Sequence, residues 1–401
     1  MIRLYDFDEV KPEEILNRDI RAEADVEATV DAIIADVRAR GDAALLDYAA
    51  KFDHAQLTSV QVTQAEIDEA FSELEASDPE FITTLKMAAS NIRHFHEQQL
   101  HKNFVLNDRP GMVLGQKYTP IQRAGVYVPG GTAAYPSTVL MDVIPAKVAG
   151  VQQIVMTTPA GKDGKVNAGI LAAAVIAGID CIFKTGGAQA VAALAYGTES
   201  VPAVDKIVGP GNIYVATAKR KVFGKVGIDM IAGPSEILVL ADGTCSPAWV
   251  AADLLSQAEH DKLATPVLVT DSWDLAKAVQ AELEVQIPQL PRAAIARTSV
   301  DTNGKIIVTD DMKKAIDAVN IIAPEHLEVC VDDPFAVLND IQNAGSIFLG
   351  KNVPEALGDY FAGPNHTLPT SGTARFSSPL GVDDFVKKSS FIYYTREALG
   401  E

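Results

Sequence analysis

A repeated unit of a short apolar run, a glycine-rich turn and a helical stretch places the strongest limit on how this chain folds. Strands are expected at residues 125–128, 153–157, 181–184 and 206–208, with glycine turns after the first, third and fourth and a helical stretch after each. A second series begins at residues 237–240 and continues with strands near Val267, Ile306, Leu327 and Ser346. Such β-turn-α repetition predicts an α/β fold with parallel sheets covered by helices on both faces.

The length of 401 residues exceeds one ordinary domain core, so two or more domains are expected. Residues 1–23 are charged and predict an N-terminal arm, and residues 25–100 are helical in pattern. We expect residues 24–125 and 237–371 to form one discontinuous α/β domain. Residues 126–236 would be an α/β domain inserted into it, and residues 372–401 a short C-terminal segment.

The net charge of −19, from 34 basic and 53 acidic residues, excludes several partners. Such a field repels nucleic acid and anionic membranes, and we expect neither. The N-terminus lacks the apolar core of a signal peptide, and the longest apolar run, near residues 170–178, is too short to span a bilayer. The three cysteines lie far apart without a Cys-x-x-Cys pair, which fits a cytoplasmic protein.

Three polar motifs in the C-terminal half carry the chemistry. Gln257 and His260 are spaced i,i+3 at the end of a helical pattern, where an amide oxygen and an imidazole converge on one face; a polar helix end is the alternative. Glu325-His326 precedes a strand and offers two adjacent bases. The alternative interpretation is a loop pair that only caps that strand. Asp359 and His366 lie in a glycine-punctuated loop and suit a metal ligand and a substrate donor, or ordinary Asx-turn chemistry.

Other candidate sites give weaker signals. The turns at residues 186–189 and 209–212 each lie between a strand and a helix, where α/β sheets bind ligands and helix N-termini bind phosphate. Neither matches the G-x-G-x-x-G fingerprint, so dinucleotide binding has weak support from motifs alone. Cys245 and Cys330 are interpreted as buried small hydrophobic residues rather than nucleophiles.

Taken together and in order, these motifs resemble histidinol dehydrogenase over nearly the whole chain. The resemblance rests on residues 123–131 (RAGVYVPGG), 187–190 (GAQA), 209–212 (GPGN), 232–236 (AGPSE), 256–260 (SQAEH), 324–327 (PEHL), 358–360 (GDY) and 365–370 (NHTLPT).

The resemblance implies an enzyme that oxidises L-histidinol to L-histidine through histidinaldehyde with two NAD, the last step of histidine biosynthesis. It implies two incomplete Rossmann-like domains, with NAD bound by the inserted domain and zinc by the discontinuous one, and a homodimer with a shared active site. Zinc would be held by Gln257, His260 and Asp359, which also contact substrate, and Glu325 and His326 would activate water and accept protons. Glu325, Ser235 and His366 match substrate-binding positions, and Tyr127, Gln189 and Asn212 match NAD contacts.

The sequence departs from the family pattern at its C-terminal end, and it leaves three alternative functions open. Members of that family continue past residue 401 with a tail that carries a glutamate and a zinc-ligating histidine, and no histidine follows His366 here. We therefore expect a weakened zinc site and low activity. The alternatives are a zinc hydrolase with Glu325 as base, a thiol-dependent aldehyde dehydrogenase using Cys245 or Cys330, and a catalytically weak or inactive binding protein of the same family.

Overall fold

A computed structural model describes residues 1–10, 24–130 and 135–400, and the chain divides into two compact units. Unit 1 comprises Met1–Ala22, Ile231–Ala362 and Leu368–Pro379. Unit 2 comprises Glu23–Met230, Gly363–Thr367 and Leu380–Glu401. Along the described parts of the chain, no helix is both long and apolar enough to cross a membrane.

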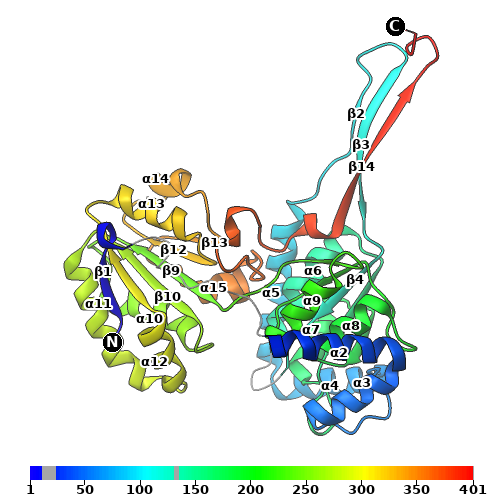
Figure 1. The fold of residues 1–401 in the computed structure, drawn as a ribbon, viewed down its shortest axis with the longest axis horizontal. Helices are drawn as coiled ribbons and strands as arrows, with labels where there is room; N and C mark the ends of the chain where they lie inside the picture. The colour runs from blue at the N-terminus through cyan, green and yellow to red at the C-terminus, as the bar shows by residue number, and fades with distance from the viewer. Residues whose placement is uncertain (11–23, 131–134, 401) are drawn as a thin grey trace. The chain divides into compact units, whose positions relative to one another are not determined.

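Unit 1 is built on a six-stranded parallel sheet (Figure 1). Its order is β1 (Arg3–Asp6), β11 (Lys305–Val308), β10 (Thr265–Thr270), β9 (Glu236–Ala241), β12 (His326–Cys330) and β13 (Ser346–Leu349). The helices of this unit are α10 (Pro247–Ala258), α11 (Trp273–Gln286), α12 (Ala293–Thr302), α13 (Met312–Ile322) and the short α14 (Pro334–Val337) and α15 (Glu355–Leu357). A π-helical turn at Gly358–Ala362 follows α15 directly.

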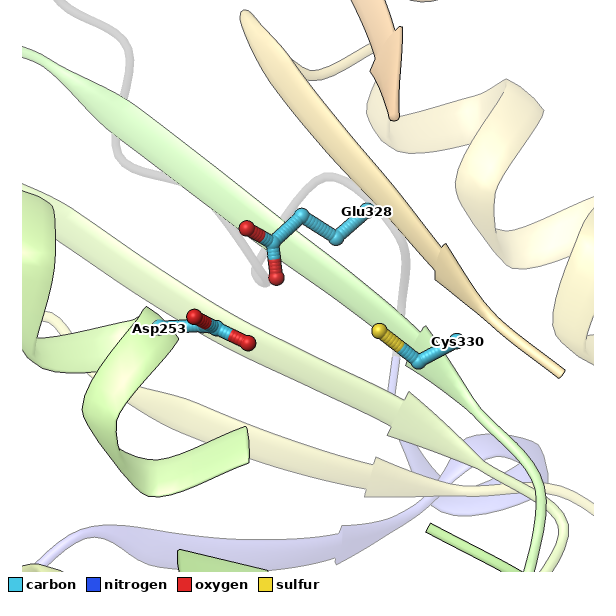
Figure 2. Close-up of side chains that lie close together, drawn as sticks. All are labelled: Asp253, Glu328 and Cys330. Atoms are coloured by element: carbon cyan, nitrogen blue, oxygen red, sulfur yellow. The ribbon is translucent and has the colours of Figure 1, made fainter. Parts of the chain in front are cut away.

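Two apolar layers flank this sheet because alternate residues of a strand point to opposite faces. One layer contains Ile237 and Val239 of β9 with side chains from α10, α11 and α12. The other contains Leu238 and Leu240 with side chains from α13. On the side of β12 that faces α10, Glu328 lies beside Asp253 of α10 and Cys330 belongs to the first apolar layer (Figure 2).

Unit 2 contains a five-stranded parallel sheet. Its order is β6 (Cys181–Lys184), β5 (Gln153–Thr158), β4 (Arg123–Tyr127), β7 (Lys206–Val208) and β8 (Gly227–Ile228). The strand order reverses at β4 and β7, and such a switch point is where open α/β sheets bind ligands, outside the carboxyl ends of the strands. The helices are α2 (Ala24–Arg40), α3 (Asp42–Tyr48), α4 (Gln64–Ser77), α5 (Pro79–Glu97), α6 (Pro136–Ala149), α7 (Ala168–Ala177), α8 (Gly187–Tyr196) and α9 (Ile213–Val222).

The predicted parallel sheets and their strands are confirmed, whereas the division of the chain differs from the expected one. Residues 24–125 belong with 126–230 rather than with 237–371. The physical reason is packing: Val30, Ile33 and Val37 of α2 share one buried core with residues of α8 and α9. The sequence period shows that this helix has an apolar face, but it does not identify the partner of that face.

Both chain ends also differ from the prediction of an arm and a short segment. Residues 3–6 form β1, which pairs in parallel with β11 at the edge of the unit 1 sheet, and residues 11–23 of the expected arm lie outside the described residues. In unit 2, β14 (Val386–Tyr394) pairs antiparallel with β3 (Met112–Pro120), and β2 (Phe104–Leu106) pairs with the other edge of β3. Residues 380–401 are therefore part of unit 2, and residues 372–379 are part of unit 1.

Candidate active site

Glu325 and His326 lie at the start of β12, as the sequence predicted, and one backbone residue of the neighbouring strand holds both. The N–H of Glu236, the first residue of β9, donates to Glu325 Oε2 at 2.8 Å. The Glu236 carbonyl accepts from His326 Nδ1 at 2.9 Å. Because a carbonyl only accepts, the proton must reside on Nδ1, and Nε2 is directed elsewhere. Both side chains are buried.

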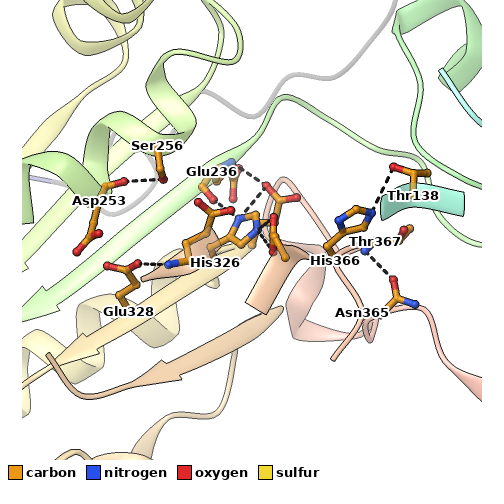
Figure 3. A network of polar contacts seen from close by, with 12 residues as sticks. Thr138, Glu236, Asp253, Ser256, His326, Glu328, Asn365, His366 and Thr367 are labelled. Atoms are coloured by element: carbon orange, nitrogen blue, oxygen red, sulfur yellow. Dashed lines mark hydrogen bonds and ion pairs between the residues drawn. The ribbon is translucent and has the colours of Figure 1, made fainter. Parts of the chain in front are cut away.

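Nε2 of His326 points to a buried carboxylate (Figure 3). It lies 3.2 Å from each carboxylate oxygen of Asp359, which belongs to the π-helical turn after α15. Glu355 of α15 completes the group, since donor atoms of His326, Glu355 and Asp359 all lie within 4.8 Å of one another. All three residues are buried, so they form a site that is able to hold a metal ion.

Burial and mutual charge shift the pKa values of these groups. Burial raises the pKa of Glu325 to about 8. Burial alone lowers the pKa of His326, but the carboxylates of Glu325 and Asp359 outweigh it and raise the pKa to about 10. Burial and the neighbouring Asp359 raise the pKa of Glu355 to about 7. Large pKa shifts of this kind in one buried cluster are typical of functional sites.

His260 lies near enough to this group for the charges of Asp359 and His326 to act on it, but the geometry of Gln257 and His260 differs from the expected helical pair. Gln257 is buried in the last turn of α10, whereas His260 follows the end of the helix in a turn, where its N–H donates to the Gln257 carbonyl at 3.0 Å. Burial lowers the pKa of His260, and the charge of Asp359 acts to raise it. Among the described His, Cys, Asp and Glu side chains, the group that converges here is His326, Glu355 and Asp359, without His260.

The remaining unit 1 residues are Ser235, which the sequence singled out, and Glu355, which it did not. Ser235 precedes β9, is half-buried, and its carbonyl accepts from Thr265 N–H at 3.0 Å. Glu355 lies four residues before Asp359, a spacing that places two carboxylates on one helical face. The i,i+4 spacing of Glu355 and Asp359 was a sequence signal that could have identified Glu355. It was missed because residues 358–366 were expected to form a loop rather than a helical turn.

In unit 2, two of the expected NAD residues flank the switch point of the sheet. Tyr127 ends β4, and Asn212 follows β7. Gly209, at the start of the turn after β7, has φ +115°, and a Cβ on it would lie 2.1 Å from the Tyr127 carbonyl oxygen. Only glycine allows this close approach of the two loops.

The side chains of these residues also have structural roles. Tyr127 is buried, and its hydroxyl accepts from Gly187 N–H at 3.2 Å, where α8 begins. Asn212 caps α9 by accepting from the N–H groups of Tyr214 and Val215. Gln189 is buried in the first turn of α8.

His366 belongs to unit 2, where its Nε2 lies 3.3 Å from Thr138 Oγ1 of α6 (Figure 3). Its neighbours anchor the same loop to α6. Asn365 Nδ2 donates to the Met141 carbonyl at 2.6 Å, and Thr367 Oγ1 lies 2.9 Å from Asp142 Oδ1. The loop that carries His366 is therefore fixed to the first turns of α6.

Comparison with known proteins identifies the family. The family model for histidinol dehydrogenase matches residues 16–401. A histidinol dehydrogenase from Listeria monocytogenes is 54% identical over 393 residues, covering 98% of this chain and 90% of the relative. One from Bacillus subtilis is 57% identical over 373 residues, covering 93% of this chain and 87% of the relative. The crystal structure of histidinol dehydrogenase from Elizabethkingia anophelis superposes with a TM-score of 0.95 at 39% identity, covering 100% of this chain and 92% of that one. The chain belongs to the histidinol dehydrogenase family.

Proposed function

We propose that this chain is an NAD-dependent oxidoreductase that converts L-histidinol to L-histidine through histidinaldehyde, using two NAD. Family membership indicates the substrate, and the buried Glu325–His326–Asp359 arrangement is the observation that carries the chemistry. Two successive oxidations of one carbon need bases close to that carbon, and this arrangement places a carboxylate and an imidazole side by side.

Zinc is proposed at Gln257, His260 and Asp359, and the donor set fits the ion. An amide oxygen, an imidazole and a carboxylate are acceptable zinc ligands. Burial lowers the pKa of His260, which favours the neutral imidazole that binds metal. Beside Asp359, Oε1 of the buried Glu355 has no hydrogen-bond partner, as expected where a cation belongs. When bound, zinc would fix the imidazole and amine of histidinol and draw the Asp359 charge away from His326.

The residues of the chain then move protons in both oxidations. In the first, the substrate hydroxyl gives its proton to Nε2 of the neutral form of His326 as the carbon gives a hydride to NAD. Water then adds to the aldehyde, and Glu325 accepts its proton. Because Glu325 has taken that proton, the adduct is a gem-diolate anion, which gives a second hydride to NAD and leaves the carboxylic acid. The Glu236 backbone supports both steps, since its N–H and carbonyl hold Glu325 and His326 in fixed orientations.

NAD is proposed to bind in unit 2 at Tyr127, Gln189 and Asn212. Tyr127 and Asn212 follow β4 and β7, the strands at the switch point, and Gln189 lies in the first turn of the helix after β6. Helix N-termini at these turns attract the negative charge of a pyrophosphate. Ser235 and His366 are proposed substrate contacts, and a homodimer is the proposed assembly.

The decisive experiment measures NADH absorbance with L-histidinol and NAD, with and without added zinc. We expect two NADH for each histidine formed and a roughly hundred- to ten-thousand-fold loss of rate in Glu325→Gln. His260→Ala should weaken zinc binding, measured by competition with a chromophoric chelator. Histidinol binding without NADH formation by the zinc-loaded protein would overturn the proposal and favour a non-catalytic binding protein.

A further inference from the structure

A second group of donor atoms lies in unit 1, between α10 and β12 (Figure 2). Asp253 projects from α10, and Glu328 and Cys330 project from β12. The side chains of alternate strand residues share a face, so Glu328 and Cys330 both point toward the α10 side of the sheet. Carboxylate oxygens of Asp253 and Glu328 and the sulfur of Cys330 lie within 4.8 Å of one another.

Glu328 is completely buried, and half of its carboxylate has no partner. Its Oε1 accepts from the N–H of Glu355 at 2.8 Å. Its Oε2 is shielded from solvent and has no donor other than a proton that Asp253 could share, and the carboxylate is directed toward Asp253 and Cys330 (Figure 2). A buried acceptor without a partner is costly, so this oxygen points to something that belongs between the three side chains.

The charges lead to the same conclusion. Among the described residues, no Lys, Arg or His forms an ion pair with Asp253 or Glu328. Carboxylate oxygens of Asp253 and Glu328 lie within 4.8 Å of each other. Two facing carboxylates in a low-dielectric interior require a cation or a shared proton between them.

We propose that Asp253, Glu328 and Cys330 bind a divalent transition-metal ion, with zinc the favoured metal. The thiol decides the class of ion, because thiolate ligands select zinc over magnesium or calcium, and carboxylates complete a mixed zinc site. On binding, the Cys330 thiol proton and the proton shared by Asp253 and Glu328 are both released to solvent, and the thiolate and the two carboxylates become ligands. The ion would tie α10, which carries Gln257, to β12, which begins at His326.

This site is separate from the metal site of the proposed function, whose ligands offer only nitrogen and oxygen. Cobalt(II) distinguishes the two, because only thiolate coordination gives an intense sulfur-to-cobalt charge-transfer band in the near ultraviolet. The full chain, stripped by a chelator and reloaded with cobalt, should show this band. It should vanish in Cys330→Ser and persist in Cys181→Ser, since Cys181 lies on β6 in unit 2. It should also persist in His260→Ala, whatever happens to NADH formation.

Metal content gives a second measurement that does not depend on the thiol. Zinc-loaded wild type should hold one more equivalent of zinc than Glu328→Gln, with circular dichroism confirming that the variant is folded. The proposal is overturned by a folded cobalt protein without the band, by a band that survives Cys330→Ser, or by equal zinc content in wild type and Glu328→Gln. Each of these outcomes leaves a proton shared between Asp253 and Glu328 as the neutralising partner.

Discussion

Replacing Lys219 with methionine should destabilise unit 2 strongly, because Lys219 and Asp229 form an ion pair that is almost fully buried. Their side chains are 3% and 1% exposed. Lys219 Nζ also donates to the Gly209 carbonyl at 2.9 Å, and Asp229 Oδ2 accepts from Gly209 N–H at 2.8 Å. The pair therefore holds both backbone groups of the first residue in the proposed NAD loop.

The size of the effect follows from what the substitution leaves behind. Removing one partner of a buried ion pair costs roughly 3–5 kcal/mol, because the other charge stays buried without compensation. Asp229 keeps its hydrogen bonds from Gly209 and Met230, which favours the lower part of that range. We expect a loss of about 3–4 kcal/mol, or a fall in Tm of about 6–16 °C for a unit of this size.

Thermal unfolding followed by circular dichroism tests this value. The matched control is Lys165→Met, which breaks an ion pair with Glu69 whose side chains are 63% and 56% exposed. Exposed pairs contribute about 0–1 kcal/mol, so this control should unfold close to wild type. The double variant Lys219→Met/Asp229→Asn also removes the unpaired Asp229 charge, so it should recover at least half of the lost free energy of unfolding.

The predicted cost of leaving the Asp229 charge unpaired would be refuted if Lys219→Met unfolded within about 2 °C of the Lys165→Met control. It would also be refuted if the double variant were no more stable than Lys219→Met alone, since the stranded charge would then not be the cause. In active enzyme, Lys219→Met should raise KM for NAD more than it lowers kcat, because the substitution loosens Gly209 and not the catalytic residues.

Three further outcomes are expected. Burial raises the pKa of Asp142 to about 8, so between about pH 4 and 8 the folded chain binds one more proton than the unfolded chain and stability falls as the pH rises. Asp142→Asn should remove this slope in pH-dependent urea unfolding, and an unchanged slope would contradict the assignment. Gly209→Ala forces a Cβ to within 2.1 Å of the Tyr127 carbonyl and should cost at least roughly 2 kcal/mol in urea unfolding. Gly224→Ala, at φ +99° with nothing within 4 Å, should cost less, and equal losses would exclude the steric cause. Burial raises the pKa of Cys245 to about 11, so Cys245→Ser should form NADH within about twofold of wild type. A loss of activity would instead support a thiol mechanism.

Much of the secondary structure could be predicted because it depends on local pattern. The end of α2 at Arg40, before Gly41, and the strand that begins at His326 follow from apolar period and turn residues. The placement of Glu325-His326 at the mouth of a strand is confirmed for the same reason. The catalytic and ligand roles of the site residues remain predictions.

Contacts between distant segments could not be predicted in the same way. The charged start of the chain gave no signal for β1, whose pairing with β11 joins residues some three hundred positions apart. Likewise, β14 is exposed along most of its length and acquires its structure from pairing with β3. An edge strand of this kind is specified by its hydrogen-bonding partner more than by its own apolar pattern.

The sequence by itself determined that this chain is an α/β protein and that a carboxylate lies beside an imidazole at residues 325 and 326. Both properties depend only on the order of neighbouring residues along the chain. Only the tertiary structure decided that Glu236 holds these two side chains, that Asp359 and Glu355 face His326, and that Glu328 is buried against Asp253. The physical reason is that pKa values and metal affinity depend on burial and on charges a few ångströms away. Those neighbours come from separate elements that only the packing of the sheet brings together.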